Sequence, residues 1–318
     1  MISLRELADL ARRYEADLSH PVDILRVGKR IIDVDVTPVI MGCVNLSRDS
    51  RYRESIAPST RSAIRKGFVL AAQGADIVDI GAESSNPHSA RVDTKEQISA
   101  LVPVVKELAR QGIAVSVETY DAAVARACLE AGALVLNYTG GVASDEGIFP
   151  IVADHQATMI LCHIEGTDAR DASARGVDED PVSGMVDYFI KRVEHARSMG
   201  VERIVIDPGI GFSYRGSIAA DVRIRHQARS LLNTFRLRRI GLPVCHSLPH
   251  AFDLFEDEFR VAEGFFAVLA HLGGTGLYRT HEVPKIRAIL SVLRELGLGS
   301  VGTSEGYRQQ RDGTGPRP

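Results

Sequence analysis

Several signatures of specialised proteins are missing from this sequence. Its 4 cysteines are scattered and form no CxxC pair, and no HExxH spacing occurs, so neither a disulfide framework nor a zinc site is indicated. The formal net charge of -3 gives no basic excess of the kind that nucleic-acid binding requires. No apolar run approaches the roughly 20 residues that span a bilayer. The composition therefore favours a globular protein that binds neither nucleic acid nor membrane.

The N-terminal segment, "MISLRELADLARRYEADL", has the charged, amphipathic pattern of a helix and lacks the apolar stretch of a signal peptide. Scattered cysteines are also typical of reduced thiols. We therefore expect a cytoplasmic protein.

What the sequence does contain is a regular alternation of short apolar runs with segments of helical periodicity. The runs are rich in β-branched residues and nearly continuous in apolar character, as strands buried on both faces are. They cover residues 38–45, 75–83, 113–119, 133–139, 157–164, 203–209, 242–247 and 276–281. A GxGxxG turn after the first run, typical of an open Rossmann sheet, is missing.

This pattern predicts an α/β protein with a closed (β/α)8 TIM barrel. We expect residues 1–37 to form an N-terminal helix and hairpin that cap the barrel, and residues 38–298 to form the barrel itself. Residues 299–318 are polar and glycine-rich, which predicts a flexible, disordered tail.

Each predicted strand ends in a residue that can ionise or hydrogen-bond. Taken alone, such a residue most often caps a helix or begins a turn. In a barrel, however, the carboxyl ends of all strands meet at one mouth, so together they favour a polar ligand. The strand-end residues are Asn45, Glu83, Glu118, Asn137, His163, Asp207, His246, Arg279 and His281.

The chemistry of these side chains indicates what kind of ligand would fit. The ionised carboxylates of Glu118 and Asp207 only accept hydrogen bonds, and they pair best with parallel N–H groups such as those of a 2-amino-pyrimidinone. The Asn137 amide suits a mixed donor–acceptor edge. Arg279 can stack on a heterocycle or bind an anion. Asn45, Ser85 and His281 suit an oxyanion such as phosphate.

These residues lie in segments that resemble the successive signatures of the dihydropteroate synthase family of pterin-binding barrels. The segments are "VIMGCVNLSRDS", "GADIVDIGAESSNP", "VSVETYDAAVARACLEAGALVLNYTGG", "MILCHIEGT", "IVIDPGIGFS" and "LYRTHEV". The resemblance implies a transferase in which the amine of p-aminobenzoate displaces pyrophosphate from dihydropterin pyrophosphate. It also implies a homodimer formed through late barrel helices.

Carried over by position, the resemblance assigns roles to individual residues. Glu118, Asn137, Asp207 and Arg279 would bind the pterin as substrate or cosubstrate. Asn45 would lie near the pyrophosphate, and near Mg2+ if a pyrophosphate substrate is used. Ser85, Arg279 and His281 would surround the anion or the pterin face, which makes Asn45, Arg279 and His281 candidate catalytic residues.

The sequence departs from the family pattern on the side of the second substrate. Arg48 stands where the family has proline and Arg51 where it has phenylalanine, and Asn86 replaces an arginine. The family's lysine after the seventh strand is missing, and an ungapped alignment places Pro249, His250 and Ala251 there. We assign Ser85, Asn86, Arg48 and Arg51 to an anion or second-substrate site.

Four functions follow from the resemblance and the departures. The main prediction is a pterin- or folate-binding transferase with an altered second-substrate site that favours an anionic partner over the 4-aminobenzoate of a standard synthase. The alternatives are a methyltetrahydrofolate-dependent methyltransferase, a true dihydropteroate synthase and a non-catalytic pterin-binding paralogue. In a methyl transfer, His246, His250 or Tyr138 would supply a proton.

Overall fold

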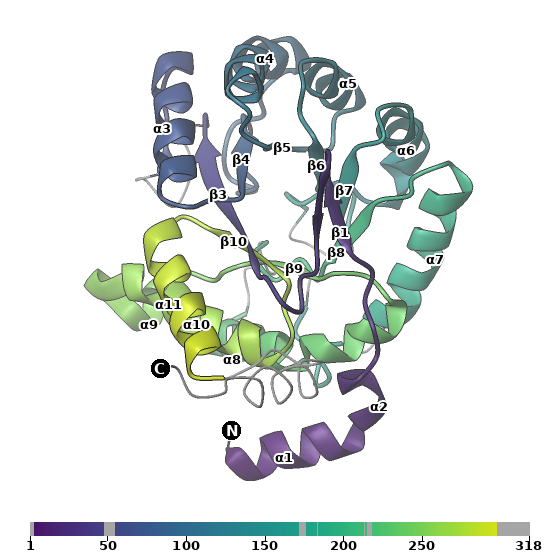
Figure 1. Ribbon diagram of the computed structural model, residues 1–318, viewed down its shortest axis with the longest axis vertical. Helices are drawn as coiled ribbons and strands as arrows, with labels where there is room; N and C mark the ends of the chain where they lie inside the picture. The colour runs from purple at the N-terminus through teal and green to yellow at the C-terminus, as the bar shows by residue number, and fades with distance from the viewer. Residues whose placement is uncertain are drawn as a thin grey trace, which may run out of the picture.

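Parallel strands form a barrel, and helices surround it (Figure 1). The computed structural model describes residues 3–47, 55–171, 176–182, 184–212, 214 and 218–297. Its large sheet has 8 strands in the order β8-β7-β6-β5-β4-β3-β10-β9. The strands are β3 (Val39–Asn45), β4 (Ile77–Gly81), β5 (Val115–Thr119), β6 (Val135–Tyr138), β7 (Thr158–Cys162), β8 (Ile204–Asp207), β9 (Cys245–Ser247) and β10 (Leu277–Thr280). The predicted fold class is confirmed, and every predicted strand overlaps an observed one.

The barrel is nearly closed. Its seam lies between β8 and the short strand β9, where Ile206 bridges Val244 in parallel and the Ile206 amide donates to the Pro243 carbonyl at 3.0 Å. Closure brings the carboxyl ends of the strands to one side of the molecule, which is where a (β/α)8 protein places its reactive groups.

Amphipathic helices cover the outside of the barrel. They are α3 (Thr60–Ala72), α4 (Thr94–Arg110), α5 (Ala122–Glu130), α6 (Asp145–Asp154), α7 (Met185–Ser198), α8 (Ala220–Asn233), α10 (Phe259–Leu272) and α11 (Val283–Glu295), with the short α9 (Phe252–Phe255) before α10. Capping residues explain where some of them begin. The Asp93 carboxylate caps α4 by accepting a hydrogen bond from the Glu96 amide at 2.9 Å. The Asp121 carboxylate caps α5 by accepting one from the Ala123 amide at 2.8 Å.

The alternation of side chains along each strand separates two cores. Outward residues such as Ile80, Val117 and Leu161 pack against the helices. Inward residues such as Met41 and Ile160 fill the barrel. Because successive residues of a strand face opposite sides, a shift of one position decides whether a side chain reaches the barrel interior.

The N-terminal segment brings an antiparallel hairpin to the amino ends of the strands. It contains α1 (Leu4–Arg13), α2 (Glu15–Leu18) and an antiparallel hairpin of β1 (Leu25–Val27) and β2 (Arg30–Ile32). Leu25 and Val27 are buried in the same cluster as the inward strand residues. The hairpin therefore covers the end of the barrel opposite the polar mouth.

Some predictions concern parts of the chain outside the described residues. These are the tail over residues 299–318 and the two loop arginines, Arg48 and Arg51. Among the helices that are described, none has the length and apolar character needed to cross a membrane.

Candidate active site

The interior of the barrel changes from apolar to polar along its axis. Near the amino ends of the strands it is filled by residues such as Leu277, Ile77 and Val205. Toward the carboxyl ends, the same inward positions carry polar side chains, which are Asn45, Asp79, Ser116, Glu118, Asn137, Asp207, Ser247 and Arg279. In (β/α)8 enzymes, polar side chains at the carboxyl ends of the strands form the ligand site, and apolar side chains fill the barrel below them.

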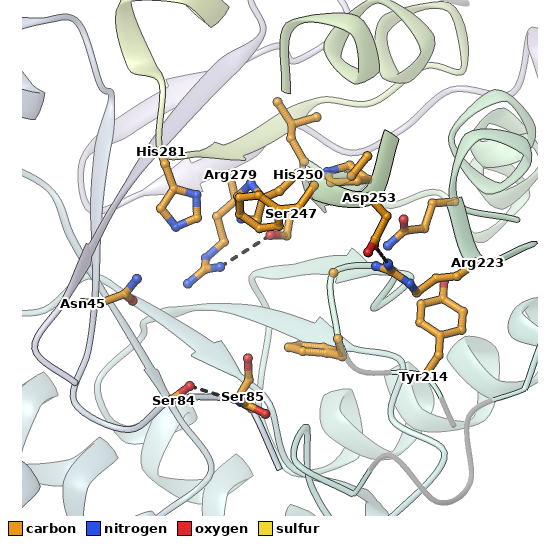
Figure 2. A pocket seen from close by; sticks show the side chains of 18 of the residues that line it. Asn45, Ser84, Ser85, Tyr214, Arg223, Ser247, His250, Asp253, Arg279 and His281 are labelled. Carbon is orange, nitrogen blue, oxygen red and sulfur yellow. Dashed lines mark hydrogen bonds and ion pairs between the residues drawn. The ribbon is translucent and has the colours of Figure 1, made fainter. Parts of the chain in front are cut away.

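A cavity of about 430 Å³ opens above this polar layer. Six of the predicted site residues line it, which are Asn45, Ser85, Asn86, Glu118, Arg279 and His281. Figure 2 shows Asn45, Ser85, Arg279 and His281 around the cavity, with Ser247 at the end of β9 and His250 just after it. The cavity is therefore lined by the ends of β3, β4, β5, β9 and β10, together with the segment after β8 and helix α8.

Arg279 of β10 lies at the centre of this site and connects three strands. Its Nε donates to Asp79 Oδ2 of β4 at 2.7 Å, and its Nη2 donates to Glu118 of β5. Nη1 lies 3.5 Å from the Ser247 hydroxyl of β9. The guanidinium thus faces two carboxylates at the floor of the cavity.

The charges in this cluster hold one another in place. Burial opposes the charged form of Arg279, but the ionisable groups of Cys43, Glu118 and Asp79 raise its pKa well above its ordinary value. Burial raises the pKa of Glu118, and the positive charge of Arg279 counteracts that effect. Any ligand that competes for Glu118 must therefore offer donors that compensate this carboxylate as Arg279 does.

Asn137 and Asp207 lie deeper than the cavity wall. Asn137 Nδ2 donates to Asp79 Oδ2 at 3.3 Å, and its Oδ1 faces the Cys162 thiol at 3.7 Å. Asp207 is buried and accepts the Gly209 amide at 2.7 Å. The predicted pterin ligands thus share one buried layer, in which Glu118 and Arg279 reach the cavity and Asn137 and Asp207 lie behind them.

The loop after β4 forms one side of the mouth. Buried Arg170 holds it by donating to the carbonyls of Ser84 at 3.0 Å and Ala90 at 3.3 Å, and to that of Ser89. Its guanidinium also pairs with Glu83 at 3.4 Å. Arg170 thereby shapes the loop that carries Ser85 and Asn86.

Two residues that we expected as proton donors at the mouth lie elsewhere. His246 is the outward neighbour of the inward Ser247, so its ring is fully buried between strand and helix, 2.8 Å from the Thr234 hydroxyl. Burial lowers its pKa to about 3. Tyr138 likewise points outward and donates to Asp145 at 2.9 Å. The predicted role of His246 as a catalytic residue is wrong. Side chains alternate along a strand, and His246 occupies an outward position.

Four residues of the site were missed by reasoning from strand ends. Asp79 lies in the middle of β4. A carboxylate inside an otherwise apolar strand could have indicated a site residue, because a buried charge needs a partner. Glu263 lies on α10 and orients His281, and Arg223 of α8 pairs with Asp253 at 2.7 Å at the mouth. For Arg170, Glu263 and Arg223 the local sequence offers no signal, since helix and loop positions reach the site only through the fold.

Comparison with known proteins agrees with this geometry. The chain is 35% identical over 186 residues to a dihydropteroate synthase of Mycobacterium leprae, an alignment that covers 58% of this chain and 66% of that protein. A dihydropteroate synthase of Synechocystis is 29% identical over 84% of this chain and 93% of its own length. A crystal structure of Xanthomonas albilineans dihydropteroate synthase with 4-aminobenzoic acid superposes with a TM-score of 0.72 at 27% identity, covering 86% of this chain and 98% of that one.

The family profile described as "Pterin binding enzyme" matches residues 41–247, which include the strands that carry Asn45, Glu118, Asn137 and Asp207. That match spans more than half of the chain. With the barrel and its polar mouth, it establishes that this chain belongs to the pterin-binding enzyme family.

Proposed function

We propose that this protein is a dihydropteroate synthase, which joins a dihydropterin pyrophosphate to 4-aminobenzoate. The observation that carries the proposal is the buried acid and amide layer of Asp79, Glu118, Asn137 and Asp207 beneath Arg279. In the reaction, the amine nitrogen forms a bond to the pterin methylene carbon, the bond from that carbon to oxygen breaks, and pyrophosphate and a proton leave.

The floor of the cavity suits the N–H edge of a pterin. A carboxylate pairs with two adjacent N–H groups. Glu118 supplies such acceptors at the cavity wall, and Asp207 supplies them in the buried layer behind it. Because Arg279 contacts Glu118, we expect the guanidinium to shift when the pterin edge takes its place. It would then be able to stack on the ring.

The departing pyrophosphate needs positive charge and hydrogen-bond donors. His281, Arg279 and Ser85 lie in the cavity wall and supply them. Mg2+ prefers oxygen ligands and usually keeps its waters and substrate phosphates, so a single amide oxygen fits it. Asn45 is the candidate for that ligand, and its Nδ2 donates to Ser55 Oγ at 2.5 Å, which fixes the amide plane.

The reaction does not need a protein nucleophile. Burial raises the pKa of the thiols of Cys43, Cys162 and Cys245 at the barrel interior, which makes them poor nucleophiles. Binding and orientation of two reactants, with stabilisation of the leaving anion, account for the chemistry.

The pterin site is tested by Asp207→Asn. This variant removes a charge-assisted acceptor worth about 1.5–3 kcal/mol, so pterin affinity in calorimetry should fall about tenfold or more. Asp221→Asn, on the exposed face of α8, is the matched control and should bind as the wild type does. If Asp207→Asn binds pterin as tightly as the wild type does, Asp207 does not contact the pterin.

A second candidate function is the same transfer to a different amine. Our main prediction was an altered second substrate, and none of the three relatives described above supports it, since all are dihydropteroate synthases. What favours it is the sequence of the second-substrate side. Arg48 and Arg51 follow the first barrel strand, and the segment after the seventh strand, with Pro249, His250 and Ala251, lacks the family's lysine. The relatives give no support to methyl transfer.

One assay separates these functions. Purified protein is mixed with dihydropterin pyrophosphate and either 4-aminobenzoate or p-aminobenzoylglutamate, and pyrophosphate release is followed with identification of the product. Dihydropteroate formed at enzyme-like turnover supports the synthase. Release only with the longer, more anionic amine supports the altered substrate. Pterin binding without release from either amine would point to the non-catalytic paralogue, and no binding at micromolar pterin would contradict the proposal.

A further inference from the structure

Two histidines and a glutamate meet at the rim of the cavity, on three different elements. His250 follows β9, His281 follows β10, and Glu263 lies on the facing side of α10. His281 Nδ1 is 2.9 Å and His250 Nδ1 is 3.2 Å from the same oxygen, Glu263 Oε1. The two rings have centroids 4.8 Å apart, and both His250 and His281 line the cavity (Figure 2).

The carboxylate of Glu263 is fully buried and held by donors on its other oxygen. Glu263 Oε2 accepts from the Thr280 hydroxyl, from the His281 amide at 3.0 Å and from the Glu282 amide at 3.3 Å. These contacts turn Oε1 toward the two imidazoles. Hydrogen bonds behind a carboxylate that orient it toward imidazole nitrogens are the usual support of a metal ligand.

The spacing of the three groups fits a small transition-metal ion. With metal–nitrogen and metal–oxygen bonds of roughly 2.0–2.2 Å, two ligand atoms of a tetrahedral site lie about 3.3–3.4 Å apart. The observed separations of 2.9 and 3.2 Å need an opening of only a few tenths of an ångström. All three ligand atoms lie within 4.8 Å of one another.

We propose that His250, Glu263 and His281 bind a divalent transition-metal ion such as Zn2+. Two imidazoles and one carboxylate leave a fourth position open, as catalytic zinc sites do. Because His250 and His281 line the cavity, that position is available to an anionic oxygen of a ligand bound there. The donor set also separates this site from a magnesium site, since Mg2+ prefers oxygen ligands in octahedral geometry.

The burial of the carboxylate supports the same conclusion. Glu263 is fully buried, and a carboxylate enclosed beside two imidazoles is a ready ligand for a cation. The alternative is that both Nδ1–H groups simply donate to Oε1, and metal binding distinguishes the two.

The experiment uses the full-length protein without a histidine tag, dialysed against a chelator. Zn2+ is titrated by calorimetry and Co2+ by its visible absorption, each with excess Mg2+ present. We expect one ion per chain with a Kd of about 1 μM or tighter, unaffected by Mg2+. The His250→Ala and Glu263→Gln variants should each weaken Co2+ binding by roughly tenfold or more.

The matched control is His195→Ala. His195 Nε2 pairs with Glu146 at 3.0 Å on the protein surface, and among the described residues no third ligand joins this pair. Its loss should leave metal affinity unchanged. His250→Ala alters a loop residue, so this variant should keep its circular dichroism spectrum even if Glu263→Gln does not. Absence of Zn2+ and Co2+ binding by the wild type at 100 μM, or unchanged affinity in His250→Ala, would overturn the proposal.

Discussion

At the scale of single residues, the direction in which a strand residue points decides its role. Asp79, Glu118 and Arg279 occupy inward positions of three strands and pair in the centre of the barrel. Their outward neighbours, such as Val78 and Tyr278, pack against helices. His246 lies outside the site for the same reason, because its side chain points outward from β9.

The ion pairs of Arg279 should contribute to stability as well as to binding. Arg279→Met leaves the buried carboxylate of Asp79 and that of Glu118 without their cation, which should lower the free energy of unfolding by about 3–5 kcal/mol. Urea unfolding measures the change. Arg225→Met is the control, because its pair with Asp221 is exposed and should contribute much less to stability. Adding Asp79→Asn to Arg279→Met should restore part of the loss, and a cost equal to the control's would contradict the pairing.

The buried ring of His246 predicts a pH dependence of stability. Burial lowers its pKa from 6.5 to about 3. As pH falls below 6.5, the unfolded chain binds a proton that the folded protein does not, so stability conferred by this residue is present above pH 6.5 and is lost as pH falls toward 3. Between pH 7 and pH 5, this residue should cost the folded state about 2 kcal/mol.

The His246→Gln variant tests this dependence. Glutamine does not titrate and keeps a polar group near the Thr234 hydroxyl. Chemical unfolding at pH 7 and pH 5 should show a smaller loss in the variant than in the wild type, by about 2 kcal/mol. Parallel curves for both proteins would show that His246 is as easily protonated in the folded state as in the unfolded one.

At the scale of elements, the active-site loops depend on side chains from other segments. The loop after β4 is fixed by Arg170, which comes from the segment after β7 and donates to three of its carbonyls. A loop held in this way presents Ser85 and Asn86 at constant positions.

Arg170→Met should loosen this loop without unfolding the barrel. Loss of the guanidinium removes hydrogen bonds to three loop carbonyls, each worth about 0.5–1.5 kcal/mol, so amide hydrogen exchange over residues 84–91 should become at least about tenfold faster. Exchange in β5 and β6 should stay as in the wild type. Arg203→Met is the control, since Arg203 donates to one carbonyl, that of Gln156, away from the site. Unchanged exchange in the loop would mean that other contacts hold it.

At the scale of the whole molecule, the late helices present an apolar surface. The family resemblance implies a homodimer through the late barrel helices, and the segment with Phe265, Phe266, Val268 and Leu269 is apolar enough for such an interface. Phe266 is buried against the barrel, whereas Phe265 of α10 is 51% exposed and Val292 of α11 is 55% exposed. Exposed apolar groups on adjacent helices favour an interface there.

The prediction of a homodimer is tested with Phe265→Asp. A charge in a dimer interface carries a large desolvation cost, so the variant should be a monomer in light scattering at concentrations where the wild type is a dimer. Val222→Asp, at an exposed position of α8, should leave the mass unchanged. A monomeric wild type at about 50 μM would contradict the predicted homodimer.

Local patterns in the sequence were sufficient for the strands, the barrel and most polar strand ends, because burial on both faces and the two-residue strand period depend on neighbouring residues alone. The same period, applied fully, would have placed His246 and Tyr138 outside the barrel and Asp79 inside it. Contacts between distant segments could not be read in this way. Arg279 lies 200 residues from Asp79 and 161 from Glu118, and only closure of the barrel brings their charges together. Tertiary structure likewise decided that Glu263 of a helix faces His250 and His281, because a helix position carries no local sign of which strand end it will meet.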